Sequence, residues 1–523
     1  MRRYLWAVPG LVCAALLVGV LGASAAPDQA IRGSLVIDKT YDVPAMDPGR
    51  AYSTVASLVG HGIYETLMTY KTRKVTKPEL GLAKSLVISN GGRTFTFKLR
   101  SGIRFSDGTP MTSADVVFSL RRVKNLKASP SFLLNNVVSV RAKGPSTVVL
   151  HTNEPMAALP AALTTPSLGI LNSKVVKAQG GTDAADAAKT DKAEKFLNKT
   201  SAGSGPYVLE SFSTTTQTVL RANKRYWGGS RPGYDRIIVR NVQASAQKVN
   251  VQAGATQIAL DIASLNAAGL PARQFNVIHP IGLKIFYAFA NADPKVSALT
   301  ANPAFRKAVR KAIDYKGLAK LAGQGSKQTA GVIPSGLLGG LPASAAVTRD
   351  LAGAKASARK AGAAGESVEL WYPSDYTLHG VEFQPLAERL QSNLREAGIS
   401  ITLKPTPTTV LFQSYGTGKI PLGLVWWAPD FLDPANYLTF APGEKGGLRA
   451  GWPANRGVTA AANKAATAVT GRGPLFQKFQ RELNAKSPFF PLISVPESIV
   501  SAKSVHGITP NALWVVDLAA LRP

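Results

Sequence analysis

Apolar and polar residues alternate strictly along residues 94–100, Thr-Phe-Thr-Phe-Lys-Leu-Arg. This period of two predicts a half-buried β-strand with the two phenylalanines and the leucine on its buried face. Thr112 and Asp115 then have the spacing of a capping box, in which each residue satisfies a backbone N–H group of the other. The pattern therefore predicts a helix that begins after Thr112 and continues at least through Leu120.

A second pattern, in the last third of the chain, combines both periods. Residues 368–372 and 399–403 are short apolar runs typical of strands, and residues 383–397 have the apolar spacing of an amphipathic helix. Gly398 follows this helix at the position where a left-handed residue commonly ends one. Strand, helix and strand at this spacing predict a βαβ unit, and hence an α/β fold.

Two further stretches indicate how these elements are connected. Residues 283–291, Leu-Lys-Ile-Phe-Tyr-Ala-Phe-Ala-Asn, predict a buried strand and are the best candidate for a crossing between two parts of the molecule. Residues 155–166 and 174–205 form a connection rich in Ala, Gly, Asp and Lys. This composition predicts an irregular surface excursion.

Residues 1–26 have the three parts of an export signal. Two arginines give a positive start, residues 5–21 are apolar, and residues 23–26, Ala-Ser-Ala-Ala, give a cleavage site. The single cysteine, Cys13, lies inside the apolar run without the small residues that precede a lipid-modified cysteine. We therefore predict export to the periplasm by a cleaved signal peptide, and a mature protein without thiols or disulfides.

The composition is that of a globular protein, with 45% hydrophobic and 18% charged residues over a length of 523, enough for two or three domains. The formal net charge is +30 at pH 7, an excess that would suit a polyanionic partner. The basic residues are spread along the whole chain, however, and no group of them has a known nucleic-acid-binding motif. We interpret the charge as a solvated basic surface and expect no nucleic-acid partner.

The residue types that often carry catalysis or bind metals are scattered along the sequence. The five histidines are isolated from one another: His61, His151, His279, His379 and His506. None has a second histidine at metal-ligand spacing. The chain also has no nucleophile elbow, phosphate-binding loop or dinucleotide fingerprint. The sequence thus predicts a protein that is not an enzyme and that holds no metal and no cofactor.

Residues 425–436, Val-Trp-Trp-Ala-Pro-Asp-Phe-Leu-Asp-Pro-Ala-Asn, follow a short apolar run typical of a buried strand. Trp427 would give a rigid apolar wall and Asp430 one fixed negative charge, which together suit a ligand pocket. The simpler alternative is a tryptophan in the core and an aspartate that caps a turn or a helix. Asp430 and Asp433 have the residue type of an acid–base pair, but an aspartate beside a proline is more simply a turn former.

This segment resembles the Trp-x-x-Asp-aromatic-x-Asp-Pro sequence of the bacterial solute-binding proteins of the dipeptide, oligopeptide and nickel type, the external receptors of ABC importers. Residues 83–122 are similar to a longer and more specific signature of the same family. Gly-Pro-Tyr at 205–207 and Tyr-Trp at 226–227 also match its pattern. The resemblance covers nearly all of the chain after the export signal.

The resemblance implies a two-lobed α/β fold of periplasmic-binding-protein type II, with an extra subdomain in the first lobe and closure by hinge motion. The expected division follows the chain order. The first lobe takes residues 27–286, with the subdomain at about 66–200, the second takes 287–490, and residues 491–523 return to the first.

The resemblance also implies which residues meet the ligand. In peptide-binding members, the aspartate that matches Asp430 contacts the α-ammonium group, and Trp427 would be the apolar wall. Further candidate pocket residues are Trp426, Tyr376, Tyr415 and His379. The expected solute is a peptide or another amine-bearing compound. The protein is expected to be a monomeric receptor that delivers this solute to permease subunits in the membrane.

Other ligands and other classes of protein stay open. The carboxylate of a peptide needs a cation, but the stretch before Trp427 has no arginine, and Lys419 and His379 are the nearest cationic residues. Nickel complexes, sugars and opines therefore remain alternatives. So do an exported hydrolase, for which no nucleophile or base is evident, and a basic envelope or chaperone-like protein that binds unfolded chains or anionic lipid.

Overall fold

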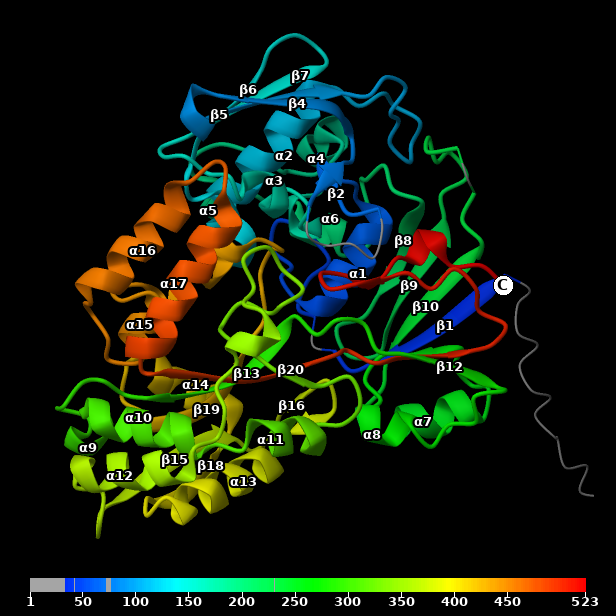
Figure 1. Ribbon diagram of the computed structural model, residues 1–523. Helices are drawn as coiled ribbons and strands as arrows, with labels where there is room; N and C mark the ends of the chain where they lie inside the picture. Colours follow the sequence, from blue (N-terminus) through cyan, green and yellow to red (C-terminus); the bar gives the residue numbers. More distant parts are fainter. Residues whose placement is uncertain (1–32, 42, 72–76, 230) are drawn as a thin grey trace, which may run out of the picture.

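The computed structural model of the protein describes residues 33–41, 43–71, 77–229 and 231–523. Three large β-sheets organise these residues, and each sheet has its own hydrophobic core (Figure 1). We call the part built on the seven-stranded sheet lobe I, the part built on the six-stranded sheet lobe II, and the part built on the four-stranded sheet the subdomain. The predicted export signal lies outside the described residues.

The sheet of lobe I is mixed. In spatial order its strands are β12 (Phe275–Ile278), β21 (Ile499–Ala502), β11 (Ile258–Ala259), β1 (Ser34–Lys39), β10 (Arg236–Asn241), β9 (Gln217–Ala222) and β8 (Tyr207–Phe212). β1 runs parallel to both of its neighbours, and the remaining pairs are antiparallel. The carboxyl end of β1 points toward lobe II, which brings Lys39 to the contact between the lobes.

The sheet of lobe II has β13 near its centre. Its strands in spatial order are β14 (Lys327–Gln328), β20 (Phe489–Val495), β13 (Lys284–Ala290), β19 (Leu422–Trp427), β15 (Ser367–Pro373) and β18 (Ser400–Thr406). β13 is antiparallel to β19 and β20, and all but its first residue are buried. β15 and β18 are parallel and joined by the helix that ends before Gly398, so the predicted βαβ unit is confirmed.

The subdomain has an antiparallel sheet of β4 (Ala83–Ser89), β5 (Thr94–Leu99), β7 (Thr147–Thr152) and β6 (Val137–Ala142). β5 buries alternate residues, as its sequence predicts. The helix that follows begins after Thr112, and its capping box is formed, since Asp115 Oδ2 accepts a hydrogen bond of 2.8 Å from Thr112 N. Figure 1 shows this sheet at the opposite end of the molecule from β15 and β18 of lobe II.

The helices cover the faces of these sheets. In lobe I and the subdomain they are α1 (Thr54–Ile63), α2 (Ser113–Leu126), α3 (Leu159–Ala162), α4 (Ser173–Ala178), α5 (Ala187–Thr190), α6 (Glu194–Leu197), α7 (Ala244–Gln252) and α8 (Ser264–Ala267). In lobe II they are α9 (Ala298–Ala301), α10 (Pro303–Ala312), α11 (Tyr315–Leu321), α12 (Leu351–Ala361), α13 (Phe383–Glu396), α14 (Thr408–Gly416), α15 (Lys445–Arg449), α16 (Arg456–Thr467) and α17 (Arg472–Lys486). Among the described residues, no helix has the length and apolar character that crossing a membrane requires.

Short elements complete the fold. The 3₁₀ turns are η1 (Asn90–Gly92), η2 (Ser129–Leu134), η3 (Pro166–Leu168), η4 (Ala343–Ala345), η5 (Pro434–Phe440) and η6 (Leu518–Ala520). The two-stranded pairs are β2 (Met68–Thr69) with β3 (Glu79–Leu80), β16 (Thr377–Leu378) with β17 (Val381–Glu382), and β22 (Pro510–Asn511) with β23 (Val515–Val516).

The chain passes between the two large sheets in two short connections. Residues 279–283 join β12 of lobe I to β13 of lobe II, and residues 496–498 join β20 of lobe II to β21 of lobe I. The crossing thus lies just before the apolar strand rather than inside it. The predicted division points, at 286/287 and 490/491, fall within β13 and β20.

The prediction of an irregular surface excursion at residues 155–166 and 174–205 is wrong. This part contains α3 to α6, and Leu159, Val176 and Leu197 are fully buried in the cores of the subdomain and lobe I. The reason is that a few buried residues in each short helix are enough to pack such a segment on a core, although its average hydrophobicity is low. Composition alone does not show that spacing.

Candidate ligand site between the lobes

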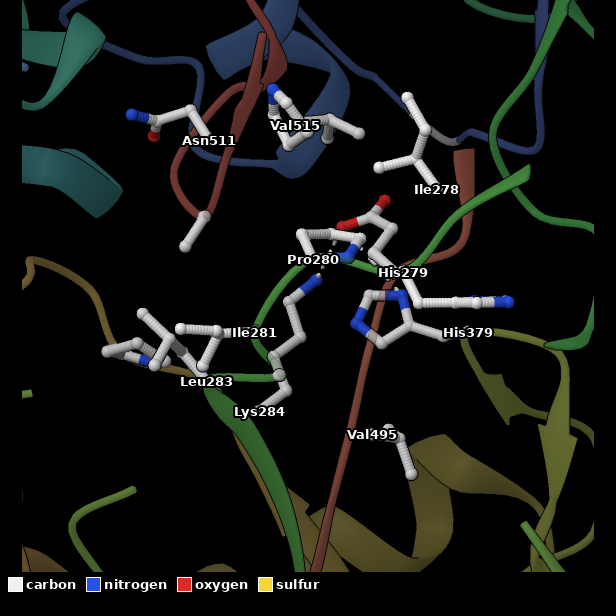
Figure 2. A pocket seen from close by; sticks show the side chains of 15 residues that line it. Ile278, His279, Pro280, Ile281, Leu283, Lys284, His379, Val495, Asn511 and Val515 are labelled. Atoms are coloured by element: carbon white, nitrogen blue, oxygen red, sulfur yellow. Dashed lines mark ion pairs between the residues drawn. The ribbon is translucent and has the colours of Figure 1, made fainter. Parts of the chain in front are cut away.

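A cavity of about 270 Å³ lies where the two connections and the C-terminal hairpin meet (Figure 2). Its walls are mostly apolar and come from both lobes: Ile278, His279, Pro280, Ile281, Gly282, Leu283, Lys284, His379, Pro429, Val495, Glu497, Pro510, Asn511, Ala512 and Val515. An apolar hollow with a few polar groups, placed between lobes, is the usual form of a site for a small ligand.

A second cavity of about 510 Å³ shares three of these residues, Lys284, His379 and Glu497. Lobe I contributes the end of β1 and the region around Asp261, and lobe II contributes the β16–β17 hairpin with the residues before it. The shared side chains therefore separate two hollows of one cleft between the lobes.

Five side chains form what we call the hinge cluster: Lys39, Asp261, Lys284, His379 and Glu497. Lys39 Nζ donates hydrogen bonds of 2.8 Å to both Asp261 Oδ1 and Glu497 Oε1. The other oxygen of Glu497 lies 3.5 Å from Lys284 Nζ and 3.7 Å from His379 Nδ1. Residues of lobe I, of lobe II and of the connection between them thus share one network of charge.

The opposite charges in this cluster stabilise each other's ionised forms. Burial opposes ionisation of Glu497, but Lys284 and Lys39 outweigh it and hold the pKa of this carboxyl well below its ordinary value. Burial also opposes the charge of Lys39, yet Asp261 and Glu497 raise the pKa of Lys39. For His379, burial and the neighbouring Lys284 lower the pKa to about 3, so the imidazole is neutral at pH 7.

Backbone strain concentrates at the first cavity. Only four described residues other than glycine have a positive φ, and two of them, His379 (φ 53°) and Val515 (φ 62°), line this cavity. The left-handed conformation is unfavourable for L-residues, most of all for a β-branched one such as Val515. Strained residues of this kind are frequent at ligand sites, where the surrounding structure fixes their position.

Asp430 lines neither cavity but follows Pro429, which lines the first, and we therefore place it at the edge of the cleft. Its Oδ1 accepts a hydrogen bond of 2.7 Å from the hydroxyl of Tyr52, which precedes α1 of lobe I. Its Oδ2 accepts one of 3.0 Å from Asn436 Nδ2 of its own turn. Burial and Asp430 together raise the pKa of Tyr52 above its ordinary value, so its hydroxyl keeps its proton and remains a donor. Asp430 therefore connects lobe II to lobe I.

The two adjacent tryptophans point to opposite faces of β19, because side chains alternate along a strand. Trp426 packs on the core that contains Phe383, and its ring stacks on Tyr376 at 4.3 Å with an interplanar angle of 12°. Trp427 packs on the other core, edge to face with Phe440. The indole Nε1 of Trp427 is buried, without a hydrogen-bond acceptor among the described residues.

The remaining candidates differ in position. Tyr376 is 39% exposed and lines the second cavity, and His379 lines both cavities. Tyr415 is 2% exposed in the core of lobe II, where its hydroxyl lies 3.1 Å from that of Tyr287. Lys39, Lys284 and Glu497 line the cleft but were not among the candidates, because no local pattern distinguishes them in the sequence.

A family model described as bacterial extracellular solute-binding proteins, family 5, matches residues 77–447. The chain belongs to this family. This family 5 protein is 28% identical over 414 residues to a protein named as the probable D,D-dipeptide-binding periplasmic protein DdpA of Escherichia coli, with 78% of this chain and 77% of the relative covered. It is 26% identical to di/tripeptide-binding protein 1 of Pseudomonas aeruginosa, with 82% of each chain covered.

Among solved structures, the ABC transporter substrate-binding protein CtaP of Listeria monocytogenes superposes with a TM-score of 0.80 at 20% identity, over 94% of this chain and 99% of that one. The predicted two-lobed α/β fold is thereby confirmed. The family 5 protein is the solute-binding component of an ABC importer, as its sequence motifs predicted. In the part of the chain that the structure describes, no group of three or more His, Cys, Asp or Glu side chains could hold a metal ion.

Proposed function

We propose that the protein captures a peptide or another amine-bearing solute in the cleft between the lobes and delivers it unchanged to permease subunits in the membrane. The observation that carries this proposal is Asp430, a carboxylate held at the edge of the cleft by Tyr52 and Asn436. A fixed carboxylate beside an apolar cavity is complementary to an ammonium group with an apolar body.

The same geometry supports closure around the ligand. Only residues 279–283 and 496–498 pass between the two large sheets within the described residues after β12, and such short segments can act as hinges. The Tyr52–Asp430 hydrogen bond spans the lobes at the edge of the cleft. We infer that an entering ammonium group joins or replaces Tyr52 at this carboxylate when the lobes close.

The relatives support the class of ligand and the place of action. Two of them are named for D,D-dipeptides and for di- and tripeptides, and further relatives, 27% identical, are named as glutathione-binding proteins. The first is also named as periplasmic, which agrees with a cleaved export signal at residues 1–26. We propose that the mature protein acts as a monomeric receptor in the periplasm and catalyses no reaction.

The test uses the mature protein in a thermal-shift screen of dipeptides, tripeptides, glutathione, opines, sugars and nickel chelates, followed by calorimetry. A peptide or another amine is expected to raise the melting temperature. The Asp430→Asn variant should bind it at least about tenfold more weakly, because a hydrogen bond between charged groups contributes about 1.5–3 kcal/mol. Asp186→Asn, at an exposed carboxylate away from the cleft, is the matched control and should bind as the wild type does.

Two outcomes would contradict the proposal. A shift with sugars or nickel chelates but with no amine would assign the cleft to another class of solute. Equal affinity of the Asp430→Asn and wild-type proteins for a peptide would keep the receptor but remove Asp430 from its site.

A further inference from the structure

The hairpin of β16 and β17 in lobe II projects against lobe I. Leu378 pairs with Val381, which leaves a turn of two residues, 379 and 380. Both have the positive φ that a type I′ turn requires, 53° for His379 and 76° for Gly380. A Cβ atom added to Gly380 would lie 2.7 Å from both Cα and Cβ of Ala263 in lobe I. The tip of the hairpin therefore touches lobe I with no room for a side chain at residue 380.

The segment of lobe I that receives this tip has a second contact with lobe II. The hydroxyl of Ser264 donates a hydrogen bond of 2.6 Å to the carbonyl oxygen of Gln324, which lies between α11 and β14. His379 itself is buried, with 6% of its side chain exposed, and its Nδ1 lies 3.7 Å from Glu497 Oε2. Figure 2 shows the imidazole ring beside the side chain of Lys284. The hairpin tip thus occupies a buried position that exists only while the lobes are in contact.

The charges around His379 are balanced when its imidazole is neutral. The cations of the hinge cluster are Lys39, at the end of β1, and Lys284, at the start of β13. Its anions are Asp261, after β11, and Glu497, in the connection from β20 to β21. A proton on His379 would add a buried positive charge beside a carboxylate that two lysines already share, which is unfavourable. Burial and Lys284 accordingly lower the pKa of His379, although Glu497 opposes them.

Other titratable side chains line the two cavities without pairing with His379. They are His279, Asp375, Tyr376 and Glu382. The carboxylate of Asp375 accepts a hydrogen bond of 2.8 Å from Thr408 N, and His279 Nδ1 lies 3.0 Å from the hydroxyl of Ser498. Among the described residues, Glu497 is the one carboxylate in ion-pair contact with His379. The hinge cluster therefore decides the charge of this imidazole.

We propose that the β16–β17 hairpin is a latch, whose tip docks on lobe I as the lobes close and does so only while the imidazole of His379 is neutral. In the open protein this imidazole is hydrated, and its pKa has the ordinary value of about 6.5. Only the open protein then takes up the proton in mild acid, so a fall in pH favours opening and release of the solute. The inference rests on the hinge closure of the proposed function and adds its regulation by pH.

Energy transfer between two dyes measures closure directly. Lys224→Cys and Lys360→Cys place the dyes at exposed positions of lobe I and of α12 in lobe II, and the single natural cysteine, Cys13, lies in the predicted export signal. The labelled mature protein is titrated with L-Ala-L-Ala at pH 7.0 and at pH 5.5. The peptide concentration that closes half of the molecules should be about five- to tenfold higher at pH 5.5, the effect expected of one group with an open-state pKa near 6.5.

Two variants and their matched controls isolate the latch. His379→Asn tolerates the left-handed backbone but takes up no proton, so half closure should need the same concentration at both pH values. His506→Gln, at an exposed histidine, should keep the wild-type ratio. Gly380→Ala should favour the open protein at both pH values, because the added Cβ would meet Ala263. Gly362→Ala, at a similar φ of 70° but with no atom within 4 Å of the added Cβ, should close as the wild type does.

The outcomes separate the latch from the proposed function. Half closure of the wild type at equal concentrations at both pH values, or a ratio that His379→Asn leaves unchanged, would overturn the latch and leave the proposed function intact. Equal closure of Gly380→Ala and Gly362→Ala would also overturn it. If no amine closed the protein at pH 7.0, the proposed function would fail. The latch would then be decided without peptide, where energy transfer should fall between pH 7.0 and pH 5.5 and a constant value would overturn it.

Discussion

Two clusters of paired charges in this protein differ in saturation, by which we mean the share of their hydrogen-bond donors that is used. In the first, which we call the Arg122 cluster, the guanidinium group donates hydrogen bonds of 2.6–2.8 Å to Asp47 and Asp191, and all three side chains are 0% exposed. Burial opposes ionisation of Asp191, but Arg122 outweighs it and lowers the pKa of this carboxyl. This guanidinium uses four of its five N–H donors, and Arg122 lines neither cavity of the cleft.

The hinge cluster is incompletely bound. Lys284 and His379 contact Glu497 at 3.5 and 3.7 Å, distances too long for good hydrogen bonds, and both line cavities. The Arg122 cluster joins segments that are packed into one body, whereas the hinge cluster joins two lobes. We infer that the saturated cluster fixes a structure, while the unsaturated one leaves polar groups available at the cavities.

The largest expected effect comes from breaking the saturated cluster. Arg122→Met would leave Asp47 and Asp191 buried without their cation, so the free energy of unfolding should fall by about 3–5 kcal/mol. Urea denaturation measures this loss. Arg121→Met, at the neighbouring side chain that is 48% exposed, should cost no more than about 0.5 kcal/mol. If both variants lost the same free energy of unfolding, a fully hydrogen-bonded cluster would not be evidence of a structural role.

A smaller effect should appear as a dependence of stability on pH. The pKa of His379 is about 3 in the folded protein, against about 6.5 in an unfolded chain, so the unfolded state binds more protons between these values. Stability should therefore fall as the pH falls, with a contribution from His379 of about 2 kcal/mol between pH 7 and pH 5. His379→Asn, which tolerates the left-handed backbone, should lose this contribution.

The control for that measurement is His506→Gln, at an exposed histidine, which should keep the wild-type pH dependence. Burial also lowers the pKa of His61 and of His279. Both contribute equally to every variant, so only differences between variants are compared. A pH profile that His379→Asn leaves unchanged would show that this imidazole is not held neutral in the cleft.

The smallest effect sharpens the comparison within the hinge cluster. Lys284→Met removes a cation that is only half-buried, unlike Arg122→Met, and Glu497 keeps its bond to Lys39. The free energy of unfolding should therefore fall by only about 1 kcal/mol, the range of a single weak interaction. Urea denaturation of this variant checks the prediction, with Lys486→Met, at an exposed lysine of α17, as the control. A loss as large as that of Arg122→Met would make the hinge cluster a structural one.

Much of the fold could be predicted because its signals are local. The alternation in β5, the capping box before α2 and the glycine after α13 each depend on residues within one element. The strand predicted before residues 425–436 is also present, as β19, and the 3₁₀ turn η5 follows it. The ligand role of Asp430 and Trp427 stays a prediction. The opposite directions of Trp426 and Trp427 follow from the same period of two.

Long-range positions could not be predicted in this way. Tyr415 has the residue type of a pocket wall, yet its helix α14 turns it into the core toward Tyr287. Lys39, Lys284 and Glu497 lie in three separate parts of the sequence, and nothing near any of them indicates the others. Only strand order and the two connections bring their side chains together.

The sequence by itself determined the elements of this protein, its family and the carboxylate that we propose for an amine. These depend on periodicity, capping and motifs, which act over a few residues. The tertiary structure alone decided that the end of β1, the start of β13 and the β20–β21 connection meet at one cleft. The physical reason is that charges separated by hundreds of residues interact only after the sheets have assembled. Once they are buried there, each donor without a hydrogen-bond partner costs free energy.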